Sequence, residues 1–201
     1  MDNSKWTRKK AFFAGVTVLC VVAVVIIMHI ALFGSLTKEN DRQYIERSDY
    51  YAIYRTNDMF FCSFYDKDGN TVKTDGPFIR QPHIKTVYDK LLRVTWQSGT
   101  GMGTQFAYYF DIEQSRFSEL FRSVFDEYCD NVVYCTDEKV IVQNIFNKDD
   151  FYLEITEFEK PFSAVAFPFE NICFTDRGKK LSITYYSGDD YKTVTEYKLI
   201  Q

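Results

Sequence analysis

The sequence predicts an all-β domain, folded as an antiparallel meander, that follows one N-terminal transmembrane α-helix. Three observations lead to this prediction. A 23-residue run at 11–33 contains no Asp, Glu, Lys or Arg. From residue 49 onward, short segments rich in Tyr, Phe, Val, Ile and Thr alternate with turn residues, which is typical of antiparallel strands. Aromatic residues form 18% of the 201-residue chain and supply enough apolar area for a folded core.

The apolar run is long enough to cross a bilayer, since a helix of this length rises roughly 34 Å. Lys5, Arg8, Lys9 and Lys10 lie directly before it, whereas the residues that follow it are balanced in charge. Because positive flanks stay on the cytoplasmic side, we expect residues 1–10 inside the cell and the large domain outside. Residues 11–36 are thus predicted to be a single-pass signal anchor in the cell membrane, with the lipid bilayer as its partner.

A cleaved signal peptide is the alternative interpretation of this segment. Such peptides have an apolar region of about 7–15 residues followed by a small-residue cleavage pattern. The run here is longer and ends in Leu32-Phe33-Gly34-Ser35, which does not match that pattern. We therefore expect the segment to stay attached.

The polar, mixed-charge residues 37–48 are predicted to be a linker, and residues 49–201 an extracytoplasmic β domain. DKDGNT at 66–71 is predicted to be a hairpin turn, with Gly69 or Asn70 at positive φ. The segment SRFSELFRSVFDEY at 115–128 differs, because its apolar residues fall at helical spacing behind Ser115 as a potential cap. Both a short helix and an irregular strand are compatible with it.

Four segments of the β domain resemble one another weakly. They are DMFFCSF (58–64), DKLLRVT (89–95), DNVVYCT (130–136) and ENICFTD (170–176). Their spacing is close to the length of one four-stranded propeller blade. Regular hairpins of equal length produce the same spacing, so a propeller-like arrangement and a sandwich or open barrel both remain open.

The segments WQSGTG (96–101), VIVQNIF (140–146) and LSITYYSGDDY (181–191), with their spacing, resemble segments of uncharacterised membrane-anchored or exported proteins of Clostridia-type Firmicutes. The resemblance covers the chain from about Tyr88 to its C-terminal end. It implies a bacterial surface protein with a β-meander domain. It brings no established activity and no catalytic residues.

Gly99, Gly101 and Gly103 give the chain its nearest approach to a chemical motif. A phosphate-binding loop places its glycines between a strand and the N-terminus of a helix, whose free N–H groups bind the anion. Here the following segment, QFAYYFDI, has the pattern of a strand. The glycines are therefore predicted to form a hairpin tip.

The sequence nominates no catalytic, cofactor-binding or metal-ligating residue, and no cofactor. Cys62, Cys129, Cys135 and Cys173 lack zinc-site spacing, and His83 is the sole histidine after the apolar run. The cysteines are expected to be mostly buried thiols, with room for one disulfide. No G-x-S-x-G element surrounds a serine.

The absence of a catalytic constellation in the sequence favours a binding or assembly module over an enzyme. Residues 11–201 carry 20 basic and 27 acidic side chains, which disfavours nucleic acid as a partner. The expected partner is an unknown protein or glycan at the bacterial cell surface. The alternative is a membrane-tethered cell-wall glycan hydrolase, because 27 acids leave a catalytic carboxylate pair open.

The predicted orientation is tested by protease accessibility. Protease added to intact spheroplasts is expected to digest residues 49–201, because four basic residues hold the N-terminus in the cytoplasm. Protection of these residues until the cells are lysed would reverse the orientation.

Overall fold

A computed structural model describes residues 42–100, 102–136 and 138–200. The segments at 1–10 and 11–36, for which the cytoplasmic N-terminus and the membrane anchor are predicted, lie outside these ranges. Within the described ranges, no helix has the length and apolar character needed to span a membrane. Gln43 to Gln201 belong to one compact unit.

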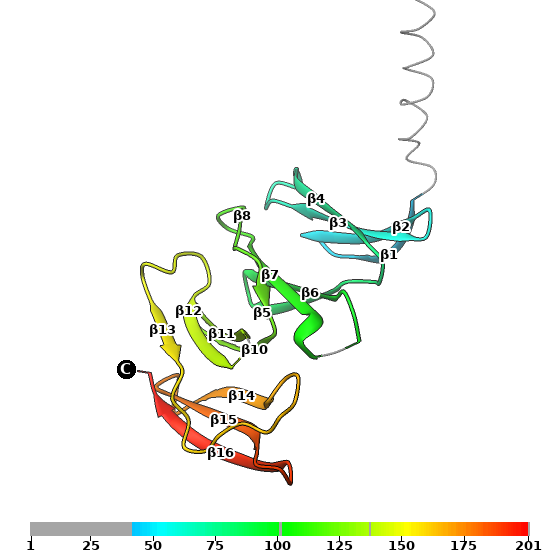
Figure 1. Cartoon of the computed structure of the whole chain (residues 1–201). Helices are drawn as coiled ribbons and strands as arrows, with labels where there is room; N and C mark the ends of the chain where they lie inside the picture. Colours follow the sequence, from blue (N-terminus) through cyan, green and yellow to red (C-terminus); the bar gives the residue numbers. More distant parts are fainter. Residues whose placement is uncertain (1–41, 101, 137, 201) are drawn as a thin grey trace, which may run out of the picture. The chain divides into compact units, whose positions relative to one another are not determined.

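The predicted all-β antiparallel architecture is confirmed. The described chain forms four sheets in sequence order, in which consecutive strands pair as a meander, except that β9 pairs with β7 rather than with β8 (Figure 1). Sheet A contains β1 (Gln43–Arg47), β2 (Tyr51–Thr56), β3 (Met59–Tyr65) and β4 (Thr71–Phe78). Sheet B contains β5 (His83–Tyr88), β6 (Leu91–Gln97), β7 (Gln105–Asp111), β8 (Arg116–Phe117) and β9 (Phe121–Arg122).

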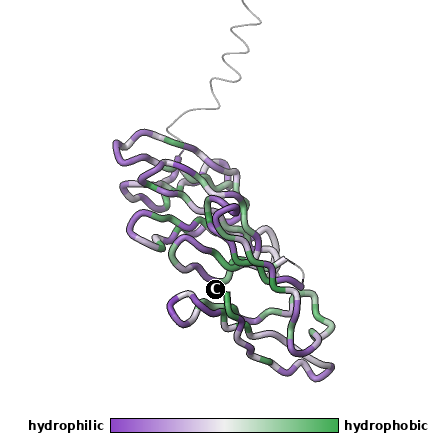
Figure 2. The backbone as a smooth tube through the Cα atoms, turned by 90° about the vertical axis from the view of Figure 1, so that its left-hand side faces the viewer, coloured by the Kyte–Doolittle hydropathy of each residue, from purple (hydrophilic) through white to green (hydrophobic). Residues whose placement is uncertain are grey.

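The second half of the chain repeats this pattern. Sheet C contains β10 (Val124–Tyr128), β11 (Asn131–Thr136), β12 (Lys139–Asn144) and β13 (Tyr152–Ile155). Sheet D contains β14 (Phe169–Thr175), β15 (Lys180–Ser187) and β16 (Lys192–Leu199). Figure 2 shows hydrophilic residues in many of the turns and hydrophobic stretches along the strands between them.

Three apolar cores join the sheets in chain order. Ile53 and Phe64 of sheet A share a core with Phe110 of sheet B. Tyr109 of sheet B shares a second core with Val132 of sheet C, and a third core joins sheets C and D. Each inner sheet is thus buried on both faces. The sheets resemble successive blades of a β-propeller rather than the two layers of a sandwich.

Residues 43–47 correct the predicted linker boundary at residue 48, because they form edge strand β1. All five residues are exposed, so the sequence shows no alternation of apolar and polar positions there. The strand is held by pairing with β2 and by the ring of Tyr44, which lies 5.8 Å from that of Tyr54.

The segment at 115–128 is irregular strand, and the alternative prediction of a short helix is wrong. Ser115, the expected cap, has a φ of 50°, and Ser123 has a φ of 54°, both incompatible with an α-helix. The aromatic residues also serve different cores. Phe117 stacks on Phe110 at 4.6 Å, whereas Phe121 contacts Tyr134 at 5.3 Å. Tertiary packing therefore overrides the helical spacing.

The four similar segments fall one in each sheet, but they are not equivalent strands. They coincide with β3, β6, β11 and β14, which are the third, second, second and first strands of their sheets. The spacing of the segments therefore matches the number of sheets, but it does not indicate which strand of each sheet a segment forms.

Both predicted hairpin turns are confirmed. Gly69 has a φ of 81°, and the Asp66 carboxylate accepts N–H bonds from Asp68 and Asn70. The glycine-rich loop joins β6 to β7, and the N–H of Ser98 donates to the carbonyl of Thr104 at its base. A single 3-10 turn, η3 (Met102–Thr104), lies within the loop directly before β7, which begins at Gln105, and Gly101 lies outside the described residues.

Gly178, in the turn between β14 and β15, marks a close approach of sheets C and D. It has a φ of 78°, and a Cβ placed there would lie 2.3 Å from the ring of Tyr128. Gly69 has a similar φ of 81° but open space around it. Comparing the same substitution at the two glycines therefore separates the cost of the left-handed backbone from the cost of the contact with Tyr128.

We expect Gly69→Ala to reduce the free energy of unfolding by roughly 1–2 kcal/mol, from the left-handed backbone alone. Gly178→Ala should cost more, because the Tyr128 ring must also move. Urea unfolding of the two full-length variants measures the difference. Equal losses would show that the Tyr128 contact contributes nothing to stability.

Candidate functional site: a groove between sheets B and C

Four turns from sheets B and C surround a groove of about 500 Å³, here called the B–C groove. The turns join β5 to β6, β7 to β8, β10 to β11 and β12 to β13. Turns project side chains without the alternation that a sheet imposes, so polar groups gather here. The lining residues are Tyr88, Lys90, Leu91, Asp111, Glu113, Gln114, Arg116, Cys129, Asp130, Asn144, Phe146, Asn147 and Asp150.

The walls of the B–C groove are predominantly acidic. Four carboxylates and two basic side chains line it. Lys90 pairs with Glu113 at 2.8 Å, and Arg116 approaches Asp111 at 3.5 Å while its guanidinium lies over the Phe146 ring. The surplus of negative charge attracts cations and repels polyanions.

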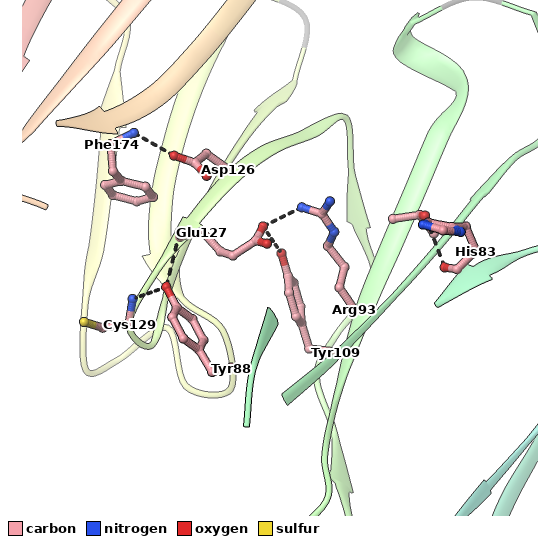
Figure 3. A network of polar contacts seen from close by, with 9 residues as sticks. His83, Tyr88, Arg93, Tyr109, Asp126, Glu127, Cys129 and Phe174 are labelled. Atoms are coloured by element: carbon pink, nitrogen blue, oxygen red, sulfur yellow. Dashed lines mark hydrogen bonds and ion pairs between the residues drawn. The ribbon is translucent and has the colours of Figure 1, made fainter. Parts of the chain in front are cut away.

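Tyr88 and Cys129 connect the two sheets at the groove (Figure 3). The Tyr88 hydroxyl accepts the N–H of Cys129 at 2.9 Å and donates to the carbonyl of Glu127 at 3.4 Å. Cys129 has a φ of 52° and its side chain is exposed. One phenol on sheet B thus holds the turn between β10 and β11 in place.

Beside the groove, a largely buried ion pair joins the same two sheets. Arg93 of β6 donates to Glu127 of β10 at 2.5 Å, and the Tyr109 hydroxyl lies 3.4 Å from the same carboxylate oxygen. The Glu127 side chain is 6% exposed and that of Arg93 is 21% exposed. Burial raises the pKa of the Tyr109 phenol well above its usual range, so it stays a neutral donor.

The adjacent acid on β10 reaches the opposite way. Asp126 accepts the backbone N–H of Phe174 on β14 at 2.9 Å (Figure 3). Asp126 and Glu127 point to opposite sides because successive strand residues alternate. Strand β10 therefore carries polar contacts to both neighbouring sheets.

A second hollow, of about 320 Å³, lies where sheets B, C and D meet. Arg93, Gln105 and Ser123 line it together with Glu170 and Asn171 of β14. The Nε atom of Arg93 is buried without a hydrogen-bond partner in the described structure. This hollow is smaller than the B–C groove and its one cation is already paired with Glu127.

The cysteines follow the expectation in part. Cys62 and Cys135 are buried, whereas Cys129 is exposed and Cys173 half-buried. All four are free thiols, so the one disulfide that the sequence allows is not formed among them. Burial raises the pKa of the Cys62 thiol to about 12 and that of Cys135 further still, which keeps both protonated.

His83 lies at the exposed start of β5, away from the B–C groove lining. Its carbonyl accepts the Thr95 hydroxyl at 3.3 Å, while its ring has no hydrogen bond within the described residues. No set of three His, Cys, Asp or Glu side chains in the described ranges is arranged to hold a metal.

The groove residues could not be found from sequence because they are distributed over four turns spanning residues 88 to 150. Each is an ordinary turn residue in its local context. A signal did exist for Arg93, which is the one charged residue in the strand segment LLRVTWQ, and such charges are paired when they are buried.

No protein-family model and no curated protein sequence matches the chain. Among solved structures, it is similar to the computationally designed Ika4 protein at 10% identity and a TM-score of 0.39, over 77% of this chain and 88% of that one. It is also similar to Hsv2 of Kluyveromyces marxianus at 12% identity and a TM-score of 0.38. That match covers 80% of this chain and 47% of Hsv2, so the chain spans about half the length of that protein.

The buried ion pair is expected to be important for stability. Glu127→Gln should reduce the free energy of unfolding by about 3 kcal/mol, because it leaves the Arg93 guanidinium charged and buried beside a neutral partner. Urea unfolding of the full chain measures this value.

The matched control is Glu154→Gln, which removes the carboxylate of the more exposed Lys139–Glu154 pair. Its cost should be at most about 1 kcal/mol. Equal effects of the two substitutions would mean that the Glu127 pair does not hold sheets B and C together.

Proposed function

We propose that this chain is a membrane-anchored binding module at the bacterial cell surface, whose β domain binds its ligand in the B–C groove. The observation that supports this most is the groove itself. It is a concave surface of about 500 Å³ in which carboxylate, amide, basic, phenyl and phenol groups from four turns converge. Turns on a rigid sheet scaffold are a common location for binding residues.

The charge of the groove limits the ligand. Four acids against two bases favour a neutral or cationic ligand and oppose nucleic acid. The amide oxygens of Asn144 and Asn147 accept backbone N–H groups within the turn between β12 and β13, which leaves N–H hydrogens of their side chains to donate to ligand hydroxyl groups. A neutral or amine-bearing glycan of the cell wall fits this combination.

The groove favours binding over hydrolysis. A glycosidase needs two free carboxyl groups on either side of the scissile bond. Asp111 and Glu113 are each next to a cation, and Asp150 accepts a hydrogen bond from the side chain of Asn147 at 2.9 Å. Three of the four groove acids thus each have one oxygen engaged by a neighbouring side chain.

The proposal is tested by sedimentation of the full chain with purified cell-wall sacculi. Replacing Glu113 and Asp130 with Lys reverses part of the groove charge and should weaken binding at least about tenfold, which corresponds to 1.4 kcal/mol. The control replaces two exposed acids outside the groove lining, Asp68 and Glu157, with Lys.

Equal binding by both double variants and the wild type would reject the groove as the site. Release of soluble glycan fragments during the incubation would instead support the hydrolase alternative.

A further inference from the structure

The open edge of sheet D differs from the other sheet edges in the described chain. Natural proteins protect edge strands by making them short, bulged or proline-containing, or by placing charged residues on them, of which β16 has Lys192, Glu196 and Lys198. Strands β8 and β13 have two and four residues, and β1, β4, β5, β10 and β14 each contain a register shift. Strand β16 has eight residues and pairs with β15 without a shift.

The backbone groups that β16 directs outward follow from its register. The N–H of Ile200 donates to the carbonyl of Lys179, so even-numbered residues bond to β15. Thr193, Thr195, Tyr197 and Leu199 therefore point their N–H and C=O groups away from it. No backbone hydrogen bond from the rest of the described chain reaches these groups.

The side chains of the same residues are exposed and partly apolar. Tyr197 is 67% exposed and Leu199 is 69% exposed. Both line a shallow hollow of about 660 Å³ with Thr175, Asp176 and Lys180. An added strand would bury these two side chains as well as satisfy the edge, which is the combination that strand addition uses.

We propose that a second copy of this chain covers this edge, with the two β16 strands paired antiparallel about a twofold axis at Tyr197. An interface about a twofold axis is isologous, which means that both copies contribute the same surface. The edge of β16 must therefore be complementary to itself. With the axis at Tyr197, Glu196 stands opposite Lys198 of the second copy, and Val194 stands opposite its Ile200. Thr195 stands opposite Leu199, and the two tyrosines face each other.

The charged side chains of β16 favour this register over the two registers whose twofold axis lies at Glu196 or at Thr195. An axis at Glu196 places two carboxylates opposite each other, and an axis at Thr195 places Lys192 opposite Lys198, both of which are unfavourable. The Glu196 side chain is 1% exposed, and its Oε1 atom has no hydrogen-bond partner in the described structure. The register at Tyr197 brings a second ammonium group to this carboxylate.

Cysteine crosslinking tests both the dimer and its register. In full-length chain with Cys20, Cys129 and Cys173 changed to Ser, Tyr197→Cys should form a disulfide-linked dimer under mild oxidation. Facing residues in a hydrogen-bonded pair have Cα atoms about 5.5 Å apart, which suits a disulfide. The matched control is Thr193→Cys on the same strand and face, whose two copies would be separated by roughly 26 Å.

Sedimentation velocity of the purified full chain in detergent gives an independent readout. The wild type should be dimeric and Thr195→Pro monomeric with an unchanged circular dichroism spectrum, because the lost N–H faces outward and bonds nothing in β15. A wild type that stays monomeric at all concentrations would overturn the proposal and leave the edge to a strand of another protein. Equal crosslinking at residues 193 and 197 would also overturn it.

Discussion

The packing of consecutive sheets against one another is the constraint on which the domain depends. A four-stranded meander has two faces, and a sheet this small is unstable in water unless an apolar face is covered. Here each apolar core is shared by two neighbours, so that Ile53 of sheet A and Phe110 of sheet B stabilise the same cluster. Sheets B and C are covered on both faces and therefore contain the most uniformly buried strands, such as β12. The polar residues on β10 act within this frame, since Glu127 fixes sheet B and Asp126 fixes sheet D.

This arrangement explains where function is expected. The faces of the inner sheets are filled by core side chains, so in the described chain the turns at the strand ends, the sheet edges and the outer faces of sheets A and D remain for recognition. The B–C groove uses the turns of the two sheets that have neighbours on both sides, and Tyr88 and Glu127 fix its position. The edge of β16 is a second surface of this kind in the described chain, because this strand pairs with β15 without a register shift.

The sequence predicts the local structure better than it predicts the site. The alternation in KLSITYYS and the turn at Asp66–Asn70 follow directly from side-chain periodicity and turn chemistry, and both are found. Strand β1 could not be predicted from the sequence because every one of its residues is exposed. A strand held mainly by backbone pairing has no hydrophobic pattern. The spacing of Phe117 and Phe121 is compatible with a helix, but in the structure the two rings pack into two different cores. The pattern alone therefore did not distinguish a helix from an irregular strand at 115–128. The groove depends on contacts between turns some twenty to sixty residues apart, which no local pattern records.

Because neighbouring sheets share their cores, we expect the sheets to unfold as one cooperative structure. Hydrogen exchange of the full chain, followed by mass spectrometry at increasing denaturant, tests it most directly. The buried strands β3, β6, β12 and β15, one from each sheet, are expected to lose protection together at a single free energy of opening. Separate openings for each sheet would contradict it, because they would show that the cores between the sheets do not couple them.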